Sequence, residues 1–257
     1  TLFPYTTLFR SIGTDNNDGE LGSVLMTETI GGGEAADIVI SSQHLLLSQG
    51  SGIASRTFTP ARGGDIRINA TESIQLREFS PINPSNGSDI TTSTWRSGTA
   101  GDLTVSTKQL TIDSQQLLSV ALDDGKGGNI TLLTEHLRLL DGGVVASTAS
   151  ESGQGGNITV NAQSTELIGF NSNNFIASAF STSTRGRNKA GDLTINTGRL
   201  VLKDGGRVGA ATFNSGRAGT IIINALESVE VSGTVPGSVN PSLIISSANV
   251  LDQIGRA

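Results

Sequence analysis

Residues 190–211 read AGDLTINTGRLVLKDGGRVGAA, and the fold of the chain can be inferred from this stretch. Two small residues, Ala190 and Gly191, come before Asp192, and apolar and polar residues then alternate from Leu193 onward. Strict alternation is typical of a β-strand with one buried face. We expect the small pair to form a sharp corner, because glycine tolerates unusual dihedral angles. The stretch therefore predicts a corner followed by a strand.

The same motif occurs seven times along the chain. Counted at its third position, the copies are separated by 28, 37, 27, 28, 35 and 28 residues. A period of about 20–50 residues predicts a solenoid, a propeller or another array. The copies are residues 35–40 (AADIVI), 63–68 (GGDIRI), 100–105 (AGDLTV), 127–132 (GGNITL), 155–160 (GGNITV), 190–195 (AGDLTI) and 218–223 (AGTIII).

Each repeat contains the pattern of three short strands. The first follows the small pair, the second lies at residues such as 45–47 and 74–76, and the third lies at residues such as 53–55 and 90–92. A propeller blade needs about 40–45 residues, which is more than the short repeats contain. We therefore predict an all-β parallel β-helix with three short strands per coil and about seven coils. Its inward columns are Ile38, Ile66, Leu103, Ile130, Ile158, Leu193 and Ile221, and Ile40, Ile68, Val105, Leu132, Val160, Ile195 and Ile223.

Composition excludes several classes of protein. The 257 residues include 33 Gly, two His and no Cys, and the net charge is −6. Without cysteine, a disulfide framework, a zinc–thiolate site and a thiol nucleophile are excluded. The negative charge argues against a nucleic-acid partner. No apolar run reaches the roughly 18 residues of a membrane span, so we predict no membrane insertion.

The two longest spacings, and the stretch after the last motif copy, contain extra residues between the second and third strands. These insertions are residues 79–87, those around 170–174, and 233–241. Insertions at one point of a repeat map to one edge of a solenoid, which is often its binding side. We therefore interpret Phe79, Asn83 and Asn86 of the first insertion as part of a candidate contact surface.

Three aromatic residues recur at one position of the repeat. Phe58, Trp95 and Phe213 each lie seven residues before the third motif position, and Leu122 occupies the same place in another repeat. Stacked aromatic side chains in such a column could bind sugar rings, or they could cover the edge of the core. Both interpretations stay open, and we include the three aromatic residues in the candidate contact surface.

The polar residues of the repeat predict no chemistry of their own. The third motif position holds Asp or Asn in six copies, which could form a ladder for cations or could simply bond nearby backbone amides in turns. His44 and His136 share one outward polar position, and Asp123 and Asp124 lie in a turn. We therefore predict no catalytic residues, no metal site and no cofactor.

The first residues differ from the rest of the chain. Residues 1–11 (TLFPYTTLFRS) contain three of the ten aromatic residues and resemble the translation of a short-read sequencing adapter. We exclude this segment from the fold as an artefact. Residues 12–34 are expected to form a partial coil or cap. Residues 35–257 are expected to contain the β-helix repeats, truncated at both ends.

The repeats resemble those of filamentous-haemagglutinin-like exoproteins, especially the long cyanobacterial type. Residues 157–162 (NITVNA) and 190–211 carry the resemblance, with the matching pair 69–76 (NATESIQL) and 224–231 (NALESVEV). It covers residues 35–257. The family implies a right-handed parallel β-helix, two-partner secretion through an outer-membrane transporter, and an adhesin role at the cell surface.

Two functions follow as hypotheses. The first is a secreted, monomeric adhesin-like rod that attaches to cells or surfaces through glycans or proteins and has no catalysis of its own. The alternative is a polysaccharide-acting β-helix enzyme, a lyase or a glycoside hydrolase. The alternative requires a groove lined by carboxylates or basic residues from neighbouring coils.

Overall fold

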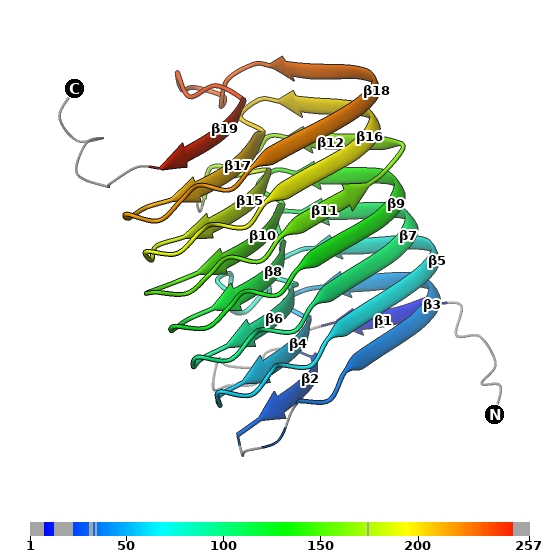
Figure 1. Cartoon of the computed structure of the whole chain (residues 1–257). Coiled ribbons are helices and arrows are strands. Elements are labelled where there is room, and N and C mark those ends of the chain that lie inside the picture. Colours follow the sequence, from blue (N-terminus) through cyan, green and yellow to red (C-terminus); the bar gives the residue numbers. More distant parts are fainter. Residues whose placement is uncertain (1–7, 13–22, 31–32, 34, 174, 249–257) are drawn as a thin grey trace.

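The computed structural model describes residues 8–12, 23–30, 33, 35–173 and 175–248. All of its regular elements within these ranges are β-strands, and they form two large parallel sheets and one small hairpin. The hairpin pairs β13 (Phe170–Asn171) with β14 (Ile176–Ala177) in antiparallel orientation. Figure 1 shows the strands of both sheets stacked in sequence order, from β2 at one end to β18 and β19 at the other.

Each sheet takes one part of every repeat. The first sheet contains β1 (Leu8–Ile12), β3 (Ile38–Ser48), β5 (Ile66–Arg77), β7 (Leu103–Asp113), β9 (Ile130–Leu140), β11 (Ile158–Asn161), β12 (Ser164–Ile168), β16 (Leu193–Lys203) and β18 (Ile221–Ser232). The second contains β2 (Val24–Thr29), β4 (Gly52–Thr57), β6 (Ile90–Thr94), β8 (Gln116–Ala121), β10 (Val144–Ala149), β15 (Ala179–Thr184), β17 (Arg207–Thr212) and β19 (Leu243–Ala248). We call a strand of the first sheet and the following strand of the second sheet a layer.

The predicted first and second strands of a repeat are one element in most layers. β3, for example, includes both, with a shift in its pairing to β5 between Ser42 and His44. Only β11 and β12 divide this part of the repeat into two strands, and both pair with β9 and β16. A continuous strand therefore replaces the break that the sequence predicted, and its pairing shifts register at this point between β3 and β5, β5 and β7, and β16 and β18.

The predicted inward columns are confirmed. Ile38 pairs with Ile66, and the register continues through every copy to Ile221. Most of these side chains are buried in the core between the two sheets. Ile221 and Ile223 are half-buried, because β18 has only β16 as a neighbour among the described strands.

The interior of the second sheet is partly polar. Ser119 and Ser147 are fully buried, and their hydroxyls bond the backbone at the small pairs. The Gly128 N–H donates to Ser119 Oγ at 2.7 Å, and the Gly156 N–H donates to Ser147 Oγ at 3.0 Å. These bonds satisfy corner amides that would otherwise be buried without a partner.

The expected reason for the small pair is wrong. The second residue of the pair has no positive φ in any copy. A Cβ built at Gly128 would instead overlap the carbonyl oxygen of Gly101 in the preceding layer. The same overlap with the layer before occurs at Gly64, Gly101, Gly156, Gly191 and Gly219. Close approach of two backbones, rather than dihedral freedom, therefore requires glycine here.

Positive φ angles occur at a different corner, where the chain leaves the first sheet. The residue after each long strand is left-handed, for example Gln49 at 57° and Glu78 at 62°. The other residues at this position are Ser114, Asp141, Gly169, Asp204 and Gly233. Five of these seven residues are not glycine, so the left-handed corner could not be located from the positions of glycine in the sequence.

The ends of the chain give a mixed result. Residues 1–7 lie outside the described residues, while Leu8–Ile12 form β1 and pair with the second half of β3. Within 12–34, Val24–Thr29 form β2 beside β4, as a partial layer would. The foreign origin of residues 1–11 stays a prediction, and residues 249–257 also lie outside the described residues.

We predict that Gly128→Ala destabilises the protein by at least ~2 kcal/mol, because the added methyl group overlaps backbone that has no room to move. Gly209→Ala in β17 is the matched control, since its Cβ would meet only Ile245 atoms at 4.0 Å. The control should change stability by less than ~1 kcal/mol. Denaturant unfolding followed by circular dichroism measures both. Equal effects of the two substitutions would contradict the close-contact explanation.

Candidate functional site

The aromatic column lies at the first residue after each strand of the second sheet. The backbone N–H of Phe58 donates to Thr29 O, and that of Trp95 donates to Thr57 O, both at 2.9 Å. The two rings are stacked, with centroids 5.4 Å apart and planes 22° apart. Trp95 is 48 % exposed and Phe58 is half-buried. The structure therefore brings two of the predicted aromatic residues into direct contact at the surface.

Phe213 occupies the same position but lies away from that pair. Between Leu122 and Phe213 the position is filled by Ser150 and Arg185, whose N–H groups bond the preceding layer in the same way. The sequence period predicted the shared column correctly. It did not bring all three aromatic residues together, because three layers, with Leu122, Ser150 and Arg185 at this position, separate Trp95 from Phe213. The contiguous apolar part is Ile30, Phe58, Trp95 and Leu122, of which all but the half-buried Phe58 are exposed; we call it the aromatic corner.

The first insertion is an ordered loop between β5 and β6. The Ser80 N–H donates to Asn86 O, and the Asn86 N–H donates to Asn83 O, both at 2.9 Å. Asn83 Oδ1 also accepts the Ser85 N–H at 3.1 Å. Phe79, Asn83 and Asn86 are each half-buried. Asn83 therefore shapes the loop, while Asn86 also faces a cavity.

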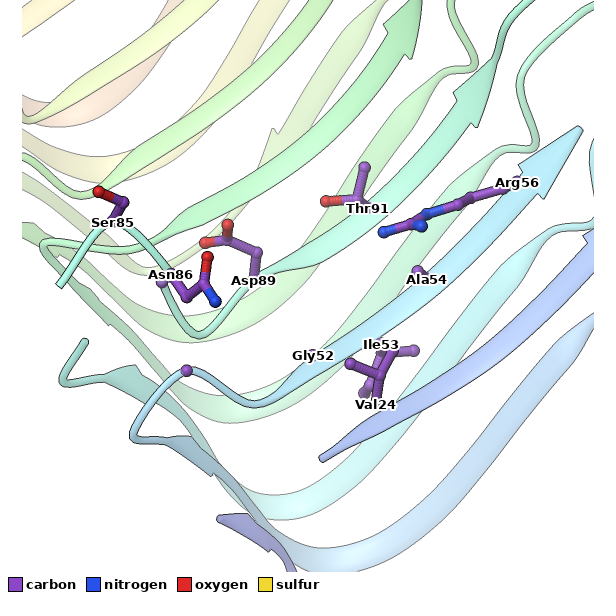
Figure 2. Close-up of a pocket in the computed structure, with 11 residues that line it drawn as sticks. Val24, Gly52, Ile53, Ala54, Arg56, Ser85, Asn86, Asp89 and Thr91 are labelled. Carbon is purple, nitrogen blue, oxygen red and sulfur yellow. The ribbon is translucent and has the colours of Figure 1, made fainter. Parts of the chain in front are cut away.

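That cavity measures about 230 Å³ and lies beside the second sheet. Figure 2 shows Arg56 on one side of it and Asn86 with Asp89 on the other. Asp89 Oδ1 accepts the Gln116 N–H at 2.9 Å. Burial raises the pKa of Asp89 from 3.8 to about 6, against the lowering effect of that hydrogen bond. Asp89 was not singled out from the sequence, because a single Asp before a strand carries no signal of burial.

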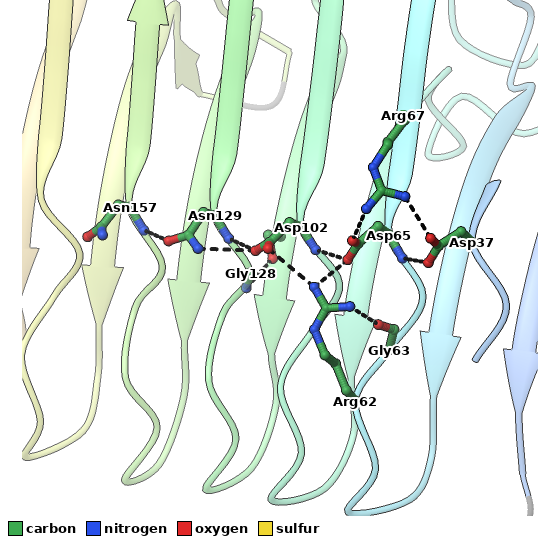
Figure 3. Close-up of polar contacts among 10 residues, drawn as sticks. Asp37, Arg62, Gly63, Asp65, Arg67, Asp102, Gly128, Asn129 and Asn157 are labelled. Atoms are coloured by element: carbon green, nitrogen blue, oxygen red, sulfur yellow. Dashed lines mark hydrogen bonds and ion pairs between the residues drawn. The ribbon is translucent and has the colours of Figure 1, made fainter. Parts of the chain in front are cut away.

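The Asp/Asn column forms a ladder of hydrogen bonds between layers (Figure 3). The Asp65 N–H donates to Asp37 Oδ1 at 2.8 Å, and the Asp102 N–H donates to Asp65 Oδ1 at 2.9 Å. The ladder continues through Asn129, Asn157, Asp192 and Thr220. The side chains thus accept backbone amides, as the turn interpretation expected, but the amides belong to the next layer rather than to the same turn.

Two arginines neutralise the acidic end of this ladder. Arg67 bridges Asp37 and Asp65, each at 2.6 Å, and Arg62 contacts Asp65 at 2.5 Å and Asp102 at 3.2 Å. The Asp65 amide, and then Arg67, hold the pKa of Asp37 below its ordinary value. These carboxylate oxygens already accept hydrogen bonds from amides and guanidinium groups, so few lone pairs and little negative charge are left to bind a metal cation. The cation-ladder interpretation therefore gains no support from this geometry.

A groove of about 510 Å³ lies at the corner after the second sheet. Asp123, Asp124, Glu151 and Arg187 line it from neighbouring layers. Ser152 Oγ donates to Asp124. The sequence placed Asp123 and Asp124 in a turn, but it did not bring Glu151 and Arg187 beside them. The sequence did contain a signal for this cluster. All four residues lie five or six positions before the third motif position of their repeat, so they occupy the same corner of successive layers.

The histidines occupy the expected outward position. His44 Nδ1 lies 2.9 Å from Ser73 Oγ, and His136 Nδ1 lies 2.9 Å from Ser164 Oγ. Among the described residues, no group of three or more His, Asp or Glu side chains is arranged to hold a metal ion.

The fold and these surfaces define the class of the protein as all-β, with two parallel sheets that each repeat extends by one layer. No protein-family model, curated protein or solved structure matches the chain. Within the described part of the chain, no helix is long and apolar enough to cross a bilayer.

We predict that Asp102→Ala lowers the free energy of unfolding by ~1–3 kcal/mol, because it removes the acceptor of the Asn129 N–H and a partner of Arg62. Asp102→Asn keeps an oxygen at the same place and should lose less than ~1 kcal/mol. Chemical denaturation of both variants measures the difference. A smaller loss for the alanine variant than for the asparagine variant would contradict the ladder as a stabilising contact.

A second prediction concerns Asp89 and pH. Its folded pKa lies above its unfolded value, so ionisation of Asp89 destabilises the folded chain progressively as the pH rises from about 4 to about 6. Asp89→Asn cannot ionise. Its stability relative to wild type should therefore increase between pH 4 and pH 7 by up to ~3 kcal/mol, since one pKa unit corresponds to about 1.4 kcal/mol. Urea unfolding at both pH values tests this, and a pH-independent difference would count against it.

Proposed function

We propose that this chain is a segment of a secreted, surface-exposed adhesin-like rod that mediates attachment to cells or surfaces. In this proposal the two parallel sheets are the faces of a right-handed parallel β-helix of about seven coils. The repeated pairing of each strand with its equivalent one repeat later supports it. The resemblance of residues 157–162 and 190–211 to filamentous-haemagglutinin-like repeats also supports it.

The aromatic corner is the observation that carries the attachment function. Its Phe58–Trp95 pair is stacked on backbone that is hydrogen-bonded to the layers before it, so its contact surface is preformed. Ile30, at 76 % exposed, and Leu122, at 37 % exposed, extend the apolar surface on either side. Exposed aromatic clusters are typical of surfaces that bind proteins or sugar rings.

The partners in this proposal follow from the resemblance and the charge. An outer-membrane partner transporter exports the protein, and glycans or proteins of a host or surface are its ligands. The rod is monomeric, lies at the cell surface or is secreted, and needs no cofactor. The net charge of −6 supports a partner other than nucleic acid.

A second candidate is a polysaccharide-acting enzyme, a lyase or a glycoside hydrolase. The groove lined by Asp123, Asp124, Glu151 and Arg187 supports it, because acid–base cleavage of a glycosidic bond uses carboxylates beside the substrate. Release of new reducing or unsaturated ends from neutral and uronate polysaccharides, lost in Glu151→Gln, would favour the enzyme over the rod.

We predict that Trp95→Ala weakens retention of the protein on a ligand-bearing surface at least tenfold, because it removes the exposed half of the stacked pair. Surface plasmon resonance on a panel of immobilised glycans and extracellular-matrix proteins measures retention. Phe213→Ala is the matched control, since it removes an exposed aromatic residue at the same position of a distant layer. Equal losses for both variants, or none for Trp95→Ala, would refute the aromatic corner as the contact surface.

A further inference from the structure

The insertions between the two sheets are built alike. A serine closes each one: Ser88 Oγ donates to Glu78 O at 2.9 Å and accepts the Gly50 N–H of the preceding layer at 3.0 Å. Ser178 makes the same two bonds to Ile168 and Gly142. In all three insertions the serine lies ten residues after the carbonyl that it bonds, and Ser242 closes the third in this way. The insertions are therefore projections that are each fixed by the same pair of hydrogen bonds.

Two of these projections face each other across layers that lack an insertion. Loop 79–87 projects from the β5–β6 layer, and the β13–β14 hairpin projects from the layer of β12 and β15. The β7–β8 and β9–β10 layers lie between them with short connections. Three layer spacings of about 4.8 Å separate the two projections by roughly 14 Å. A cleft of about 570 Å³ fills this space, within the range of small-molecule sites.

The residues that line the cleft combine apolar surface with uncharged polar groups. Phe79 lies on one wall and Ile176 on the other, while Gln116 and Asn173 contribute amides. Asp89 is the one charged residue in the lining, and no Lys or Arg reaches it among the described residues. An anionic ligand would find no cation here, whereas a ligand with hydroxyls and apolar C–H faces matches both kinds of surface.

Gln115 lies behind the surface of the cleft and connects its floor to loop 79–87. Its side chain is fully buried, and its Oε1 accepts the Ser88 N–H at 2.5 Å. Its Nε2 also lies out of solvent but has no hydrogen-bond partner. A buried amide N–H₂ without a partner is unfavourable.

We propose that the cleft between loop 79–87 and the β13–β14 hairpin binds a neutral oligosaccharide. The Phe79 ring packs against a sugar face, the amides of Gln116 and Asn173 bond hydroxyls, and Asp89 accepts a hydroxyl hydrogen bond. This proposal names a ligand class for the proposed attachment function. It rests on that function only for the biological role of the bound sugar. Binding of a soluble sugar in the cleft is independent of the aromatic corner.

The experiment applies the whole chain to a printed array of neutral, uronate and sulphated glycans. Titration calorimetry then measures the neutral trisaccharide that gives the strongest signal. We expect neutral glycans to bind, and the double variant Gln116→Ala/Asn173→Ala to weaken binding at least tenfold. Phe79→Ala is a second test variant. Asn69→Ala/Gln75→Ala, on the outer face of β5, is the matched control and should leave binding unchanged.

The outcomes are separable. The cleft proposal is overturned if the chain binds only charged glycans, only proteins, or no glycan. It is also overturned if Gln116→Ala/Asn173→Ala and Phe79→Ala keep the wild-type melting temperature and still bind neutral glycans as the wild type does. Loss of surface retention in Trp95→Ala together with any of these results would keep the attachment function and reject only the cleft. Neutral glycan binding that the cleft variants lose, without an effect of Trp95→Ala on retention, would keep the cleft and reject the aromatic corner as the contact surface.

Discussion

The structure depends on the direct contact of one layer's backbone with the next at the small pair. The carbonyl of Gly101 lies where a Cβ of Gly128 would be, and the same contact recurs at the other copies. This contact holds every layer at one height and one register. The insertions leave the stack at one corner of the repeat. All three are found between the two sheets, each closed by a serine.

The fixed register also explains the side-chain ladders. A residue type that recurs at one position of the repeat lies beside the same residue type in the neighbouring layer. This arrangement favours side chains that can hydrogen-bond or stack from each layer to the next. The ladder from Asp37 to Thr220 does so through backbone amides, and Arg62 and Arg67 balance its acidic end. Stacking of Phe58 on Trp95 is the apolar counterpart. Such ladders stabilise a repeat array by nearest-neighbour contacts.

The three candidate surfaces lie where the repeat pattern is broken. The aromatic corner exists where consecutive layers hold apolar residues, and the acidic groove exists where Asp123, Asp124 and Glu151 meet in two neighbouring layers. The cleft exists because two layers with an insertion enclose two without one. The regular layers form a rigid scaffold, and the irregular corners hold the exposed aromatic and charged side chains and the insertions. This division is common in folds whose sites lie on loops held by a stable scaffold.

The sequence by itself determined which stretches are β-strand, the two inward columns and the place of each insertion, but not that the first two predicted strands of a repeat join into one. It could do so because alternation and period are local properties, read over a few residues and compared between copies. The tertiary structure alone decided which equivalent residues meet. Phe213 shares a column with Trp95 but lies four layers away, Gly128 is required by a carbonyl from another repeat, and Asp89 is half-buried between two cavities beside loop 79–87. These contacts depend on the order and spacing of the layers. They join residues of different repeats, so they cannot be inferred from the sequence of one repeat.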